Sequence, residues 1–157
     1  MDEAKEFLMR FCRHKRIEVH TTYRGAFSPY SAPVAGSADL RQGRIYMEVW
    51  DGCAPAQEVS ALAHEIGHLL DPIGLQRYEG IPALHLAMLG TAGLTAPQFA
   101  RVWGSETYAW RVAAELLRDA GFQDWAAFFR LKRICLKSYL NPYKRARRRE
   151  TRLLGAA

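Results

Sequence analysis

The sequence predicts an α+β fold in which a small N-terminal sheet precedes a mostly helical C-terminal half. Two segments within the first fifty residues are rich in β-branched and aromatic side chains, and helical periodicity runs from about residue 55 to residue 140. The chain has 157 residues, of which 49% are hydrophobic and 24% charged, so it can bury a substantial core and is not expected to be disordered. We expect one domain over residues 1–141 and a basic tail over residues 142–157.

The N-terminal third is expected to contain a helix, two strands and a long loop. Residues 2–16 carry an apolar stripe at helical spacing, with acidic residues at the favourable N-terminal end. Residues 17–23 and 44–50 alternate roughly between apolar and polar side chains, which predicts two strands. Residues 24–43 are rich in Gly, Pro, Ser and Ala, which predicts a long surface loop. If residues 44–50 form an edge strand, that strand can align a peptide by β-augmentation.

The next part of the chain is expected to form helices separated by proline and glycine. Residues 57–70 place apolar side chains at helical spacing, and Pro72 ends this helix. The uncharged stretch 80–100 contains several proline and glycine residues, so it predicts two short helices around a turn and no membrane span. Residues 95–98 have the form of a capping box and begin a helix that Gly104 is expected to break.

Two further helices complete the prediction. Ser105 is expected to cap a helix that runs to about residue 120 and is closed by Gly121. The last helix is expected over residues 123–140, because the Asn141-Pro142 pair is a typical end signal.

The positive charge is concentrated at the C-terminal end. Residues 130–157 contain ten Lys and Arg and one acid, a net charge of +9, whereas residues 1–129 contain twelve bases and fifteen acids, a net charge of −3. The three cysteines are far apart and form no CxxC pair, which is typical of a reducing compartment. The chain begins with acidic residues where an export signal has basic ones, so we expect a cytoplasmic protein.

The segment His64-Glu65-Ile66-Gly67-His68 carries the strongest functional signal. Residues four apart on a helix lie about 40° from one another, so both imidazoles leave the same face and can bind one Zn²⁺ at about 2.0–2.1 Å. Glu65 lies beside the open coordination position, where a carboxylate can take the proton of a metal-bound water. The alternative is that both histidines are ordinary half-buried residues of an amphipathic helix.

A zinc site needs a third protein ligand. Glu106 is favoured because alanines follow it on the same helix face and allow close approach to the helix of His64 and His68. The alternative is that Glu106 only stabilises the first turn of its own helix through the macrodipole. Asp71 lies on the side of His68 but near the helix end, where we expect a hydrogen bond to a ligand imidazole.

The HExxH motif on a helix after a short strand, followed by Glu106-x-x-Ala109, resembles the gluzincin metallopeptidases and most closely the ImmA/IrrE family, whose members are common in phages and mobile elements. The resemblance covers residues 44–71 and 105–117. It implies a zincin-like fold with an active-site helix. It also implies one zinc ion per chain held by His64, His68 and Glu106, water activated by Glu65, and cleavage of a protein substrate such as a repressor or another regulator.

A peptidase of this type needs a further donor for the oxyanion. During hydrolysis zinc polarises the peptide carbonyl, and Glu65 passes the proton to the leaving amine. The sequence offers five oxyanion donors without ranking them: Tyr78, His85, Tyr108, Tyr139 and Tyr143.

The basic tail leaves two interpretations open. Like-charge runs are typical of solvated, partly disordered segments, and they also bind DNA or RNA phosphates. The residues that would make such contacts are Lys144, Arg145, Arg147, Arg148 and Arg149.

Two other functions are compatible with the motif. The first is a zinc-containing regulatory or nucleic-acid-associated binding protein without turnover. The second is a protease for nucleic-acid-bound proteins, as in the SprT-like families, which supply a third histidine downstream. In this sequence the one later histidine is His85, which lies in an apolar run.

Overall fold

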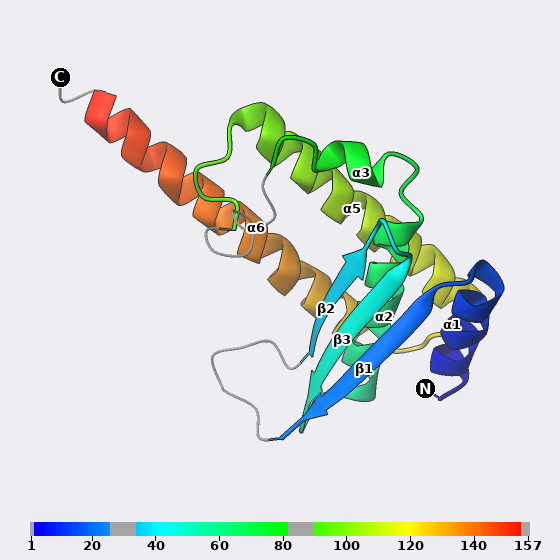
Figure 1. Ribbon diagram of the computed structural model, residues 1–157. Coiled ribbons are helices and arrows are strands. Elements are labelled where there is room, and N and C mark those ends of the chain that lie inside the picture. The colour runs from blue at the N-terminus through cyan, green and yellow to red at the C-terminus, as the bar shows by residue number, and fades with distance from the viewer. Residues whose placement is uncertain (1, 26–33, 82–89, 155–157) are drawn as a thin grey trace.

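The computed structural model describes residues 2–25, 34–81 and 90–154, and it confirms the α+β fold (Figure 1). A three-stranded sheet lies in the N-terminal part, and the C-terminal half is helical. The elements in chain order are α1 (Asp2–Lys15), β1 (Glu18–Arg24), β2 (Val34–Asp39), β3 (Arg44–Trp50), α2 (Pro55–Leu69), α3 (Gly74–Arg77), α5 (Ala96–Asp119) and α6 (Trp125–Leu154).

The sheet has the order β1-β3-β2, with β1 parallel and β2 antiparallel to the central strand β3. Along β3, Ile45, Met47 and Val49 are buried in the main core, and the residues between them are more exposed. This is the period of two that a strand with one covered face requires. Because β3 is central, the suggestion that it aligns a peptide as an edge strand is wrong.

Strand β2 lies within the segment that we expected to be a long loop, so that prediction is wrong over residues 34–39. Its sequence, VAGSAD, has one bulky β-branched residue and therefore little local β signal. Pairing with β3 makes it a strand, and this pairing depends on tertiary contacts.

Helix α2 packs against the sheet on one side and against α5 on another (Figure 1). The two helices approach most closely at Gly67, where a Cβ atom would lie 2.4 Å from the carbonyl oxygen and 2.8 Å from the Cα of Ala109. Ala109 and Ala113 are fully buried at this contact. The predicted close approach through small residues is therefore confirmed.

Helix α5 is continuous through Gly104, so the predicted break and the new helix capped by Ser105 are wrong. The capping box is confirmed, because the Thr95 hydroxyl accepts from the Gln98 amide and the Gln98 side chain accepts from the Thr95 amide. One glycine inside a helix costs about 1 kcal/mol. Burial of the α5 face against α2 offsets this cost, since Val102, Ser105 and several later residues of α5 are buried.

Helix α6 is continuous through Pro142, so the predicted end at Asn141-Pro142 is also wrong. Proline inside a helix removes one backbone hydrogen bond and costs about 3 kcal/mol. Tertiary contacts lie on both sides of this position: the Thr91 hydroxyl donates to the Tyr139 carbonyl, and the Tyr143 ring stacks on Phe99 at 3.9 Å. The expected boundary after residue 141 therefore lies inside one helix.

The segment between Pro72 and α5 is only partly described. The short helix α3 was not predicted. Of the two short helices expected around a turn in residues 80–100, the first falls on residues 82–89, outside the described residues, and the expectation of a second short helix is wrong, because residues 96–100 are the start of the long helix α5. None of the helices in the described ranges is long and apolar enough to cross a membrane.

Candidate metal centre

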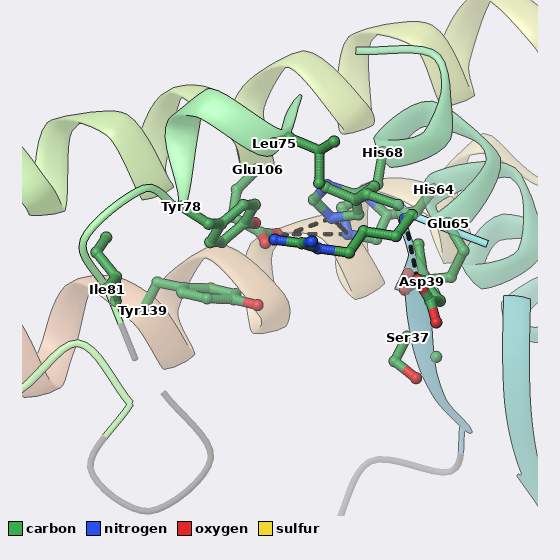
Figure 2. Close-up of a pocket in the computed structure, with 14 residues that line it drawn as sticks. Ser37, Asp39, His64, Glu65, His68, Leu75, Tyr78, Ile81, Glu106 and Tyr139 are labelled. Atoms are coloured by element: carbon green, nitrogen blue, oxygen red, sulfur yellow. Dashed lines mark hydrogen bonds and ion pairs between the residues drawn. The ribbon is translucent and has the colours of Figure 1, made fainter. Parts of the chain in front are cut away.

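Three predicted metal ligands meet at one point between α2 and α5. His64 and His68 lie one turn apart on α2, and Glu106 faces them from the middle of α5 (Figure 2). The two Nε2 atoms are 3.1 Å apart. The two carboxylate oxygens of Glu106 lie 3.3 Å from His64 Nε2 and 3.4 Å from His68 Nε2. The alternative that Glu106 only stabilises a first helical turn is wrong, because α5 begins ten residues earlier, at Ala96.

These separations are compatible with one small cation, for which ligand bonds of about 2.0–2.1 Å at tetrahedral angles place neighbouring donor atoms about 3.3 Å apart. The two imidazole nitrogens lie 3.1 Å apart, His64 Nε2 lies 3.3 Å from Glu106 Oε2, and His68 Nε2 lies 3.4 Å from the other carboxylate oxygen, Oε1. Glu106 Oε2 is buried and has no hydrogen-bond partner within the described part of the chain. The His64–His68–Glu106 group can therefore bind one metal ion.

The electrostatics of the group favour a charged carboxylate beside the imidazoles. Burial raises the pKa of Glu106, but the neighbouring His64 and His68 outweigh it and lower this pKa to about 2. Burial lowers the pKa of His68, but the Glu106 carboxylate outweighs it and raises this pKa. Glu106 is only 2% exposed, so its charge needs a compensating cation or imidazolium.

Two side chains of α5 hold the imidazole rings in place. The hydroxyl of Ser105 lies 3.2 Å from His68 Nδ1, which leaves Nε2 as the nitrogen that faces Glu106. The His64 ring stacks on Trp110 with a centroid distance of 4.1 Å and an interplanar angle of 20°. Trp110 was interpreted as a core residue, and it is both fully buried and part of the wall of the site.

Asp71 occupies a different position from the one expected. Its Oδ2 accepts from Arg77 Nε at 2.5 Å, and its Oδ1 accepts from the backbone amide of Ile73 at 3.2 Å. Among the described contacts, the partner of His68 Nδ1 is Ser105 and not Asp71. Asp71 thus anchors the turn into α3, which carries Tyr78 and Leu75 toward the site.

Glu65 lies against strand β2, beside the ligand group. A Cβ atom on Gly36 would lie 2.6 Å from Glu65 Oε1 and 2.6 Å from its Cγ, so β2 passes directly over this side chain. Burial raises the pKa of the Glu65 carboxyl, although His64 and His68 act in the opposite direction. Glu65 is not one of the three clustered donors, and it lines the same cavity as they do. It is thus placed to exchange a proton with a molecule bound there.

A cavity of about 400 Å³ opens on the three donors and Glu65. One wall is the polypeptide of β2 and the residues after it, from Gly36 to Arg41. The opposite wall contains Tyr78 and Tyr139, which come from the end of α3 and from α6 (Figure 2). Burial raises the pKa of Tyr78 to about 12 and also raises that of Tyr139, so both phenols stay protonated at neutral pH.

Two of the five candidate oxyanion donors, Tyr78 and Tyr139, line the cavity. The Tyr108 hydroxyl donates to the Leu70 carbonyl at 3.1 Å, and the Tyr143 ring stacks on Phe99. His85 lies outside the described residues. The basic residues Lys144, Arg145, Arg147, Arg148 and Arg149 are exposed on the C-terminal part of α6.

Sequence reasoning missed two residues that shape the site. Ser105 was interpreted as a helix cap because Gly104 suggested a helix start, although its position next to Glu106 was a usable signal. Gly36 was assigned to a loop, and nothing local indicates that it faces Glu65.

The donor set fits one metal ion, and the support for this interpretation is internal to the chain. Two imidazoles and a carboxylate lie together at the wall of the cavity, where they can bind the ion. The resemblance to gluzincins rests on these motif residues and their geometry. In comparisons with protein-family models, with curated proteins and with solved structures, the chain gives no match.

Proposed function

We propose that this chain is a zinc-dependent peptidase with a zincin-like site that hydrolyses peptide bonds of a protein substrate. The observation that carries the proposal is the buried His64–His68–Glu106 group, which can bind one metal ion, with the Glu65 carboxylate on the same cavity. Two imidazole nitrogens and one carboxylate are one of the donor sets of catalytic zinc sites, which keep the fourth position for water or substrate.

Each residue of the site has a distinct task in this proposal. His64, His68 and Glu106 would hold the ion, which when bound supplies Lewis-acid polarisation of the scissile carbonyl and an acidified water. Glu65 would accept the proton of that water and deliver it to the leaving nitrogen, a role that its raised pKa favours. Tyr78 and Tyr139 donate hydrogen bonds to the developing oxyanion from the opposite wall.

Strand β2 supports a peptide as the substrate. One of its edges pairs with β3, and β2 is the last strand of the sheet on that side. Its residues Gly36, Ser37, Ala38 and Asp39 line the cavity that contains Glu65. An extended peptide that adds to this edge would pass the metal ligands with its backbone hydrogen-bonded, as in β-augmentation.

The test removes the proposed proton acceptor, Glu65, and leaves the three proposed metal ligands in place. In Glu65→Gln the three donors are intact, so we expect zinc stoichiometry to be retained while cleavage of fluorescein-labelled casein falls by a factor of at least about 10². The matched control is Glu115→Gln at an exposed position of α5. It removes a carboxylate paired with Arg111 and should leave both zinc stoichiometry and cleavage activity unchanged.

Full activity of Glu65→Gln would overturn the proposed mechanism. Stoichiometric zinc together with the absence of turnover in the unmodified chain would support the alternative of a zinc-containing binding protein.

A further inference from the structure

Helix α6 presents two chemically different faces. On one face Leu131 is buried in the main core, and Cys135 and Tyr139 line a cavity next to the metal ligands. The other face is exposed and mainly basic. Six of its residues, which we call the α6 basic face, are Arg130, Arg133, Lys137, Lys144, Arg145 and Arg148, and the exposed Ile134 and Asn141 lie among them.

The continuity of α6 aligns these six residues. At 100° per residue, their positions fall within an arc of about 120°, and at 1.5 Å per residue they extend over about 27 Å. Three of them precede Pro142 and three follow it, so the alignment exists because the helix does not end at residue 141. The C-terminal part of α6 extends beyond the rest of the fold (Figure 1), and Lys144, Arg145 and Arg148 are exposed there.

The α6 basic face is not neutralised by acids. Among the side chains that the structure describes, no Asp or Glu forms an ion pair with any of these six residues. Elsewhere the pattern differs, because six basic residues each pair with an acid: Lys5, Arg10, Arg24, Arg44, Arg77 and Arg111. The six positive charges of the α6 basic face therefore remain available to a polyanion.

We propose that the α6 basic face binds the phosphate backbone of double-stranded DNA. A helix with its side chains is about 10–12 Å wide and fits the major groove of B-DNA, which is about 12 Å wide, whereas the major groove of duplex RNA is too narrow. Single strands are bound mainly through exposed aromatic rings on which bases stack. From Arg130 to Arg148 the described part of α6 has no exposed aromatic side chain, since Tyr139 and Tyr143 are half-buried, and one exposed ring, Phe129, lies just before the face.

This binding is independent of the proposed peptidase activity but has a consequence for it. Tyr139 and the basic face belong to the same helix, so DNA on one side of α6 places the metal centre close to proteins bound at the same DNA. The contacts are to phosphates, so binding is expected to be independent of base sequence, with a Kd on the order of 1–100 µM at physiological salt.

The experiment measures the fluorescence anisotropy of a labelled duplex of about 20 base pairs with the full chain, at salt concentrations from about 50 to about 200 mM. Two variants divide the face at Pro142: Arg133→Gln/Lys137→Gln and Arg145→Gln/Arg148→Gln. We expect each to lower affinity about tenfold or more at the lower salt and to reduce the slope of log K against log salt by about 2.

The control is Arg13→Gln/Lys15→Gln, which removes the same charge from exposed positions on α1 and should leave the affinity nearly unchanged. A Tm equal to that of the unmodified chain shows that each variant is folded, and Glu65→Gln should bind DNA as the unmodified chain does. Absence of duplex binding would overturn the proposal. The proposal would also be overturned if Arg145→Gln/Arg148→Gln lost affinity while Arg133→Gln/Lys137→Gln did not. Tighter binding of a single strand or of duplex RNA would overturn the assignment to DNA.

Discussion

Replacing Gly67 by alanine tests whether the α2–α5 contact sets the spacing of the metal ligands. The added methyl would lie 2.4 Å from the Ala109 carbonyl oxygen and 2.8 Å from its Cα. Ordinary carbon–oxygen contacts are about 3.3–3.6 Å, so the two helices must separate by about 1 Å. Both obstructing atoms belong to the backbone, and no side-chain rotation relieves the overlap.

The expected cost follows from this displacement. Overpacking of a core typically lowers the free energy of unfolding by about 1–3 kcal/mol, and two backbone overlaps place this case at the upper end. Replacing a helical glycine by alanine raises the free energy of unfolding by about 1 kcal/mol. A net loss of about 2 kcal/mol lowers Tm by roughly 4–8 °C for a chain of this length. Metal sites tolerate deviations of about 0.2 Å, so a shift of about 1 Å between His68 and Glu106 should also lower zinc affinity more than tenfold.

The assay is calorimetry with and without chelator, together with metal analysis. The matched control is Gly104→Ala, a helical glycine whose Cβ would lie 2.6 Å from Arg77 Nη1, the end of a flexible side chain that can move. We expect Gly67→Ala to lose stability in the metal-free state and zinc in the loaded state, and Gly104→Ala to lose neither. Wild-type Tm and zinc content in Gly67→Ala, or an equal loss in both variants, would refute the reasoning.

Three further predictions follow from single contacts. Gly36→Ala places a methyl 2.6 Å from Glu65 Oε1, so casein cleavage should fall at least about tenfold while metal analysis shows zinc retained; unchanged turnover would mean that β2 does not fix the base. Ser105→Ala removes the 3.2 Å contact to His68 Nδ1 and should weaken zinc binding about 10–100-fold in a competition titration, which an unchanged affinity would contradict. Burial raises the pKa of the Cys12 thiol from 9.0 to about 11, so the folded state holds this proton more tightly than the unfolded state. The contribution of this thiol to the free energy of unfolding is complete below pH 9.0 and should decline as the pH rises toward about 11. Denaturant titrations should therefore show a smaller decline in Cys12→Ala.

The sequence by itself determined the α+β class, the central helix and the chemistry of the candidate site. These features depend on local information: the 3.6-residue period places His64 and His68 on one face, and the residue types define the donor atoms. Glu106 was also identified, because the small residues that follow it indicate a close helix contact.

Only the tertiary structure decided where strands and helices end. Gly36 lies in a strand because β3 offers a pairing edge, and α5 and α6 continue through Gly104 and Pro142 because packing offsets the local cost. These costs are about 1–3 kcal/mol, which is smaller than the free energy of burying a helix face. Local signals of that size are therefore overruled by contacts between distant residues, and the same contacts make Ser105 a partner of His68 and align the basic residues of α6 on one face.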